Sequence, residues 1–285
     1  MSIMCAMRID GLPDDDPQRP DVTADAVIVI GGIMGSELVD RVTGRALWGI
    51  ADPRWFVRAW TRGDGLAPLA LTSEERKQLA DGTYDPDTAR VKPTRLLRLP
   101  MAAPLLRGVE PYTRLLNRIR EVVVHPGAVR EFPYDWRLPV EYNARLLAKA
   151  IREHVDAWRA HPGLMEFRRR TGDDQPVRVV LVAHSMGGLL ARGLSLIDGA
   201  TADVRATVTL GTPFYGSVKA AVLLNSGDGA PLPRQRLRQV AATMPGVYDL
   251  LPTYRCLLTT GADGHEDVVR LTPNHVGDLC ADIAE

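Results

Sequence analysis

A serine flanked by small residues stands where a strand-like run gives way to a helix-like run. Residues 177–182 are rich in valine, Ala183–Gly188 reads A-H-S-M-G-G, and leucines at helical spacing follow. A nucleophilic serine needs such a tight strand-to-helix turn, which exposes its oxygen and sets a helix N-terminus beside developing negative charge. The pattern departs from G-x-S-x-G only at Ala183, which is small enough for the turn. Ser185 is therefore the candidate nucleophile, and a turn that only packs is the competing interpretation.

Acyl chemistry on a serine also needs two backbone N–H groups aimed at the developing oxyanion. Met186 follows the serine and is expected to supply one of them. The second is expected from the glycine turn Gly31–Ser36, with Ile33 as the first choice and Met34 as the alternative. This turn could instead cradle phosphates, but it lacks the G-x-G-x-x-G spacing of dinucleotide-binding proteins.

Strand-like and helix-like segments alternate along the chain, as an α/β protein requires. Valine- and isoleucine-rich runs predict strands at 26–30, 121–124, 177–182 and 204–210, of which the first two are expected to be buried. Apolar residues at helical spacing predict helices at 111–120, at 140–159 and directly after Gly188. Alternation of this kind predicts a mostly parallel sheet with helices on both faces. The tryptophan-containing segment from 40 to 111 is expected to be an excursion from that sheet.

Composition bounds the class of protein and its partners. The chain has 285 residues, 45% of them hydrophobic and 25% charged, with 35 basic and 35 acidic side chains. One globular domain over 26–285 is expected, after an irregular lead-in over 1–25. Zero net charge gives no attraction to nucleic acid, and no apolar run is long enough for an integral membrane segment. Three scattered cysteines and the absence of a signal-like N-terminus favour a reduced, cytoplasmic protein without a metal site.

Five short segments follow one another along the chain: Gly32–Ser36 (G-I-M-G-S), Tyr134–Arg137 (Y-D-W-R), His184–Gly188 (H-S-M-G-G), Thr209–Ser217 (T-L-G-T-P-F-Y-G-S) and Leu250–Pro252 (L-L-P). In this order they resemble the segments of lecithin:cholesterol acyltransferase-like proteins. The resemblance runs from about residue 26 to residue 255. It implies a serine α/β-hydrolase fold with a lid insertion, here beginning near Phe214, and no cofactor. The implied activity is attack on a lipid ester, an acyl-enzyme, and its discharge to an alcohol or to water.

Residues beside the glycine turn and after the strands are expected to line the substrate pocket. They are Gly32, Met34, Trp136, Phe214 and Tyr215. The Y-D-W-R segment follows a strand, at the edge where sites form in α/β sheets, so it could shape the acyl pocket or brace the oxyanion loop. We favour the other interpretation, in which Asp135 contacts Arg137 and Trp136 is simply packed.

The same family places its acid in a G-D-G-T-V type segment and its base in a later histidine. Asp228, in G-D-G, resembles the acid, and His265 and His275 are the histidines that follow Ser185. Neither match is clear, and His184 is poorly aimed to deprotonate its neighbour. The simplest expectation is a chain that stops inside the lid insertion, before the strands that carry the acid and the base.

The sequence therefore predicts serine-dependent acyl transfer on a lipid-like ester, by an O-acyltransferase, lipase or esterase. The rival interpretation is a catalytically inactive binding module, or a fragment, that keeps the fold without a working triad.

Overall fold

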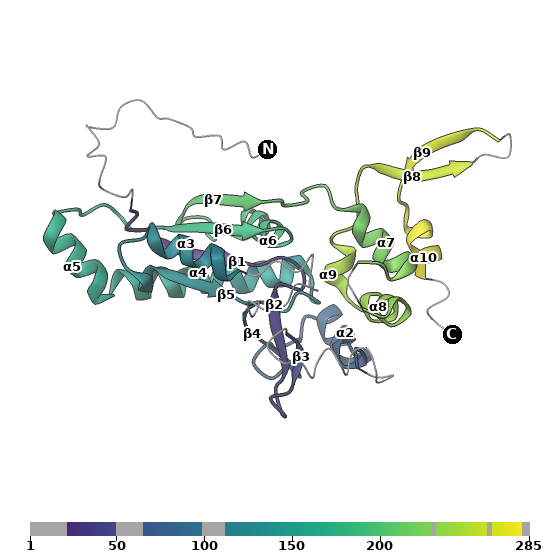
Figure 1. Ribbon diagram of the computed structural model, residues 1–285, viewed down its shortest axis with the longest axis horizontal. Helices are drawn as coiled ribbons and strands as arrows, with labels where there is room; N and C mark the ends of the chain where they lie inside the picture. The colour runs from purple at the N-terminus through teal and green to yellow at the C-terminus, as the bar shows by residue number, and fades with distance from the viewer. Residues whose placement is uncertain (1–21, 50–64, 99–111, 230–231, 261–263, 281–285) are drawn as a thin grey trace.

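The computed structural model describes residues 22–49, 65–98, 112–229, 232–260 and 264–280. Its centre is a parallel four-stranded sheet in the order β5-β1-β6-β7 (Figure 1). The strands are β1 (Ala26–Ile30), β5 (Val129–Phe132), β6 (Val179–His184) and β7 (Val204–Leu210). The expected α/β class with a mostly parallel sheet is confirmed.

The sequence of β1 explains its place inside the sheet. All five residues, A-V-I-V-I, are buried, and the strand pairs with β5 on one side and β6 on the other. A parallel strand covered on both faces needs such a continuous apolar run. Ile30 lies beside Phe132 of β5 and Ala183 of β6. The carboxyl ends of these strands therefore meet at one edge, where sites form in open α/β sheets.

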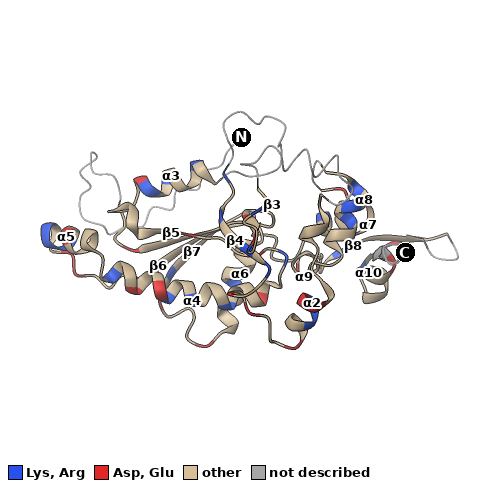
Figure 2. Cartoon of the chain, turned by 90° about the horizontal axis from the view of Figure 1, so that it is seen from below, with Lys and Arg blue, Asp and Glu red and all other residues tan. Residues whose placement is uncertain are grey.

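Helices cover both faces of the sheet, with α3 (Thr113–Glu121) on one side and α4 (Val140–Arg159) and α6 (Gly187–Gly193) on the other (Figure 2). Helix α4 spans the predicted residues and contacts β1, β5 and α6. Its buried residues recur at helical spacing and include Leu147, Ile151, Val155 and Trp158. The 3-10 turn η3 (Leu194–Leu196) extends α6, and α5 (Pro162–Thr171) ends at Gly172 with φ 72.

The strand predicted at 121–124 is wrong. Helix α3 runs to Glu121, Val123 forms only an isolated bridge to Thr23, and the 3-10 turn η2 (Pro126–Ala128) follows. The place beside β1 is taken by β5, whose sequence V-R-E-F has little apolar character. Its charged residues find partners far along the chain: Arg130 pairs with Glu153, and Glu131 with Arg98. A search for apolar runs does not find a strand whose charged residues form ion pairs with distant parts of the chain.

The predicted excursion contains a second, antiparallel sheet in the order β3-β2-β4. Its strands are β2 (Ser36–Asp40), β3 (Ala46–Trp48) and β4 (Val91–Leu96). Between β3 and β4 lie the 3-10 turn η1 (Ala67–Leu69) and α2 (Ser73–Ala80). Helix α2 begins with a capping box between Thr72 and Glu75.

Beyond β7 the chain leaves the central sheet. Three helices follow, α7 (Val218–Ser226), α8 (Arg234–Ala241) and α9 (Pro245–Tyr248), and α8 contacts both α7 and η1. A hairpin of β8 (Arg255–Thr260) and β9 (Glu266–Arg270) then projects away from the molecule, and α10 (Pro273–Cys280) returns to α7 (Figure 1). In the described part of the chain, no helix is apolar over a length that would cross a bilayer.

Candidate active site

Ser185 occupies the turn between β6 and α6 in a left-handed backbone conformation. Its φ is 50, its N–H donates to the Leu210 carbonyl of β7 at 2.9 Å, and its own carbonyl accepts from Gly188 N at 3.0 Å. A left-handed serine is strained, and such strain persists only where the surroundings impose it. The Ser185 Oγ has no hydrogen-bond partner among the described residues.

The glycines after Ser185 are required by close contacts. A Cβ on Gly187 would lie 2.6 Å from the Gly31 carbonyl oxygen, and one on Gly188 would lie 2.0 Å from Thr212 Oγ1. No larger residue fits at either position without moving β1 or the loop after β7. Ala183, which stands where the motif usually has glycine, is fully buried beside Ile30.

The predicted oxyanion segment is a tight turn over residues 32–35, packed against Ser185, and is called the oxyanion turn below. Gly35 N donates to Gly32 O at 2.9 Å, and Met34, in the third position of the turn, has φ 61. A positive φ there, without one at Ile33, defines a type II turn, which normally has glycine or asparagine at this position. A Cβ on Gly32 would stand 2.9 Å from Ser185 Cβ, so the turn and Ser185 are in contact.

The hydrogen bonds of this turn show which amides remain available. Gly32 N donates to the Tyr112 hydroxyl and Gly35 N to Gly32 O. The N–H groups of Ile33 and Met34 have no partner among the described residues, and the same holds for Met186 N. Buried backbone donors are nearly always paired, so unpaired ones beside a strained serine are suited to receive an oxyanion. This accounting agrees with Ile33 and Met186 as donors and keeps Met34 as the alternative.

Aromatic side chains hold the carbonyls of the turn in place. The indole N–H of Trp48 donates to Met34 O at 2.8 Å, and that of Trp136 donates to Ser36 O at 3.1 Å. The Tyr134 hydroxyl donates to Gly31 O at 3.0 Å, and burial raises its pKa well above the usual value, so it stays protonated. Sequence reasoning named Tyr134 as part of a segment that could brace the oxyanion loop, but it gave no role to Trp48 or Tyr112. The partner of Tyr112 lies 80 residues away in the sequence, whereas that of Trp48 lies 14 residues away. The weak signal was Trp48 itself, an aromatic residue in a glycine-rich excursion.

The Y-D-W-R segment contains the Asp135–Arg137 contact, and its Trp136 also supports the glycine turn. Arg137 is fully buried and donates two hydrogen bonds to the Asp135 carboxylate, at 2.9 and 2.6 Å. Burial is the largest single influence on the pKa of Arg137 and lowers it, but the charge and hydrogen bonds of Asp135 and the charge of Glu75 together outweigh burial and raise the pKa, so the guanidinium stays charged. The Arg137 guanidinium also donates to the carbonyl oxygen of Leu69 in η1, and the Arg137 backbone carbonyl accepts from the N–H of Gly246 in α9. The ion pair therefore fixes Trp136 against the oxyanion turn and joins it to the neighbouring helices.

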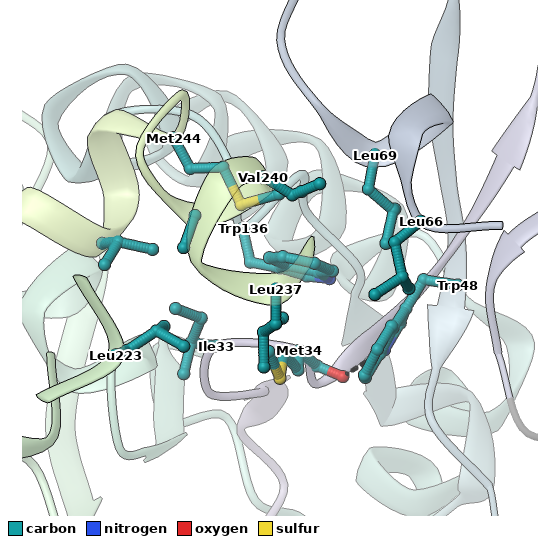
Figure 3. A pocket seen from close by; sticks show the side chains of 12 residues that line it. Ile33, Met34, Trp48, Leu66, Leu69, Trp136, Leu223, Leu237, Val240 and Met244 are labelled. Atoms are coloured by element: carbon teal, nitrogen blue, oxygen red, sulfur yellow. Dashed lines mark hydrogen bonds between the residues drawn. The ribbon is translucent and has the colours of Figure 1, made fainter. Parts of the chain in front are cut away.

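A narrow apolar pocket lies between the oxyanion turn and α8 (Figure 3). Leu237 stands near its middle, with Trp48 and Leu66 on one side and Ile33 and Leu223 on the other. The full lining is Ile33, Met34, Trp48, Leu66, Leu69, Trp136, Leu223, Leu237, Val240, Ala241, Met244 and Val247. The space between atoms is about 350 Å³ and partly open to solvent, but the cavity volume is only about 10 Å³. That is room for roughly one water molecule, so a larger ligand must displace part of the wall.

Three residues predicted to line the pocket lie outside this lining. Gly32 contacts Ser185 instead, as described above. Phe214 and Tyr215 have exposed fractions of 41% and 72%. The chain after β7 turns sharply at Gly216, which has a φ of 85, and the Tyr215 carbonyl accepts a hydrogen bond from Thr253 N. The rings of Phe214 and Tyr215 are exposed on this turn.

The structure does not bring the candidate acid and bases to Ser185. Asp228 follows the end of α7 and pairs with Arg234 at 3.3 Å. His275 lies in α10, where its Nδ1 accepts from Thr272 N, and His265 lies at the start of β9 in the projecting hairpin. Within the described ranges no three His, Cys, Asp or Glu side chains are grouped as a metal site would need.

The parallel sheet and the strand-turn-helix that carries Ser185 define an α/β-hydrolase fold. The sequence profile of one family, described as lecithin:cholesterol acyltransferase, matches residues 103–276, which is more than half of the chain. The chain belongs to that family. The matched region includes Ser185, while the oxyanion turn lies before it.

Two solved structures resemble the chain at low identity. One belongs to the crystal structure of the Tle4–Tli4 complex, with 18% identity, a TM-score of 0.46, and coverage of 88% of this chain and 60% of that one. The other is Bacillus licheniformis lipase BlEst2 in its mature form, with 16% identity, a TM-score of 0.30, and coverage of 85% and 58%. The chain thus spans less than two thirds of either structure. No curated protein sequence matches it significantly.

Proposed function

We propose that this protein is a serine acyl-transfer enzyme that cleaves a lipid-like ester, as an O-acyltransferase or as a carboxylic ester hydrolase. One observation carries the proposal: the two non-glycine residues with positive φ in the described chain, Met34 and Ser185, lie on two turns that are in contact. Strain gathered at one place is typical of an active site.

In the proposed reaction, Ser185 Oγ attacks the ester carbonyl carbon. The N–H groups of Ile33 and Met186 stabilise the oxyanion of the tetrahedral intermediate, and the alcohol leaves with the proton that the serine gave up. The acyl-enzyme is then discharged to water or to a second alcohol. Removal of one oxyanion donor typically costs about 3 kcal/mol of transition-state stabilisation.

The pocket supports an acyl chain as the group bound next to Ser185. It begins at Ile33, one of the proposed oxyanion donors, and every side chain that lines it is apolar. An acyl chain gains about 0.8 kcal/mol for each buried CH₂ group, which favours a substrate with several of them. Because the cavity volume is only about 10 Å³, we infer that α8 moves outward when the acyl chain enters.

Transfer of the serine proton needs a base, usually a histidine oriented by a carboxylate. The described residues place neither beside Ser185, and His265, His275 and Asp228 have other surroundings. We propose that the acid and the base come from outside the described residues.

The test is labelling by a fluorophosphonate probe followed by intact-mass measurement. Such probes phosphonylate a serine whose oxyanion hole is formed, even where turnover is slow. Wild type should gain one adduct mass and Ser185→Ala none. Equal labelling of the two proteins would refute the proposed nucleophile.

The specific observation that favours a second candidate is the lack of any hydrogen-bond partner for Ser185 Oγ among the described residues. It would fit an inactive binding module with an apolar pocket. That candidate predicts no labelling of wild type, together with saturable binding of a fluorescent fatty acid that Leu237→Trp abolishes by filling the pocket.

A further inference from the structure

We propose that Tyr112 is a positioning residue for acyl transfer, because its hydroxyl joins the oxyanion turn to the strand end that carries the nucleophile. This inference rests on the function proposed above and adds a residue that the sequence patterns do not reveal. Tyr112 does not touch substrate in this account; it acts through Gly32 and His184.

The contacts of the hydroxyl carry the argument. It accepts from Gly32 N at 2.8 Å and lies 2.9 Å from His184 Nδ1. Gly32 and His184 are the neighbours of Ile33 and Ser185, so one oxygen atom links both halves of the candidate site. The ring of Tyr112 packs edge-on against the His184 ring, with centroids 5.7 Å apart. Tyr112 is 4% exposed and directly precedes α3, which fixes its position.

The direction of these hydrogen bonds follows from the groups themselves. A backbone N–H can only donate, so the Tyr112 oxygen accepts from Gly32. The phenol proton is then available for His184 Nδ1, which acts as an acceptor when the imidazole is neutral with its proton on Nε2. His184 thereby orients the hydroxyl, and the hydroxyl orients the turn.

Glycine is the reason that the turn needs such an anchor. The turn packs closely against its neighbours because it has glycine at positions 31, 32 and 35. A Cβ on Gly35, for example, would lie 2.7 Å from the Tyr112 oxygen. The same residues leave the backbone free to rotate. The hydrogen bond to Tyr112 holds the Gly31–Gly32 peptide plane, and the bond from Gly35 N to Gly32 O holds the next plane, which carries the Ile33 amide. Together the two bonds set the direction of the Ile33 N–H. The bond to Tyr112 also uses up the Gly32 amide, which is therefore not itself an oxyanion donor.

A merely structural role for Tyr112 would come from its ring rather than from its hydroxyl. Tyr112→Phe keeps the ring, and the matched control Tyr142→Phe removes a phenol that donates to a backbone carbonyl, Tyr84 O, away from the site. On a short-chain p-nitrophenyl ester, we expect kcat of Tyr112→Phe to fall roughly 10- to 100-fold with KM within about twofold. Tyr142→Phe should match wild type in both.

Two variants of His184 test the second half of the link. The side-chain oxygen of asparagine can accept near the position of Nδ1, so His184→Asn should keep more of kcat than His184→Leu. Combining His184→Leu with Tyr112→Phe should lower kcat little beyond Tyr112→Phe alone, because both changes remove one connected unit. Fully additive losses would contradict the link.

Amide exchange supplies a readout that does not depend on turnover. In wild type the Gly32 amide should exchange slowly, and in Tyr112→Phe it should lose protection while the melting temperature changes little. A normal kcat in Tyr112→Phe, with wild type active and Ser185→Ala inactive, would overturn the inference and leave the proposed function standing. If Ser185→Ala retained wild-type activity, the proposed function would fail, and the positioning role would fail with it.

Discussion

Met34 and Ser185 adopt positive φ although neither is glycine, and each conformation costs about 1–3 kcal/mol. The contacts around Ser185 and Met34 hold both residues in these unfavourable conformations. Ser185 is fixed by its bond to Leu210 O and by the glycines that follow, and Met34 by the indole of Trp48.

At this scale, sequence reasoning predicted the candidate reacting groups but named only some of the residues that support them. Ser185, Ile33 and Met186 follow from a local pattern, because a strand-turn-helix and a glycine turn are written in consecutive residues. The hydrogen bond between Tyr112 and Gly32 spans 80 positions of the sequence, and that between Trp136 and Ser36 spans 100. Phe214 and Tyr215 were assigned to the pocket from their place in a motif, which does not determine where the chain turns.

Gly32→Ala tests the contact between the turn and the nucleophile. The added methyl group would lie 2.9 Å from Ser185 Cβ, closer than such atoms approach, so the turn or the serine must shift. We expect kcat to fall about 100- to 1000-fold, as on loss of an oxyanion donor. Gly277→Ala in α10 is the control, because a Cβ there meets nothing within 4 Å. Equal activity of the two variants on a short-chain p-nitrophenyl ester would contradict the contact.

Among the elements, those with a clear period were predicted well and those held by distant partners were not. Helix α4 has the predicted bounds because its apolar stripe repeats over 20 residues. Strand β5 was missed because its charged residues pair with Glu153 and Arg98. The valines at 122–124 looked like the better strand, but the chain there follows directly from α3.

The hairpin and α10 carry the two late histidines, and their placement predicts how the variants behave. His265→Ala, His275→Ala and the double variant should keep the activity of wild type, since neither element reaches Ser185. His275→Ala should cost up to about 1 kcal/mol of stability, because its ring accepts from Thr272 N at the start of α10. A loss of several orders of magnitude in kcat, with the circular dichroism spectrum unchanged, would identify the base and refute this placement.

Helix α8 supplies the part of the pocket wall that must yield to an acyl chain. Leu237→Ala enlarges the pocket, so the ratio of kcat/KM for octanoate over butyrate p-nitrophenyl esters should rise roughly tenfold. Leu116→Ala in α3 is the matched control, because the same atoms are removed from a buried site away from the pocket. Each change should cost about 2–5 kcal/mol of stability. An equal change of the ratio in both variants would mean that stability, not pocket volume, sets chain-length preference.

For the whole molecule, the central sheet is asymmetric. Strand β1 is buried on both faces, whereas most residues of β7 are exposed, including Val208 at 47%. Parallel strands are normally covered, and residues 204–210 were predicted as a strand of the parallel sheet. Burial depends on the neighbour across the sheet, and among the described residues β7 pairs only with β6. A strand's own sequence does not show whether that neighbour exists.

This asymmetry predicts the order in which the sheet opens. Hydrogen exchange followed by mass spectrometry should show the β1 peptide exchanging slowest, near the rate set by global unfolding. The β7 peptide should exchange at least about tenfold faster, because its outer edge has no partner strand among the described residues and its side chains add little buried apolar surface. Ser185 N donates to Leu210 O at the end of β7, so opening of this edge loosens the nucleophile's turn as well. If β7 proved as protected as β1, the edge would have to be covered in solution by another polypeptide, and the strand would be an internal part of a larger sheet.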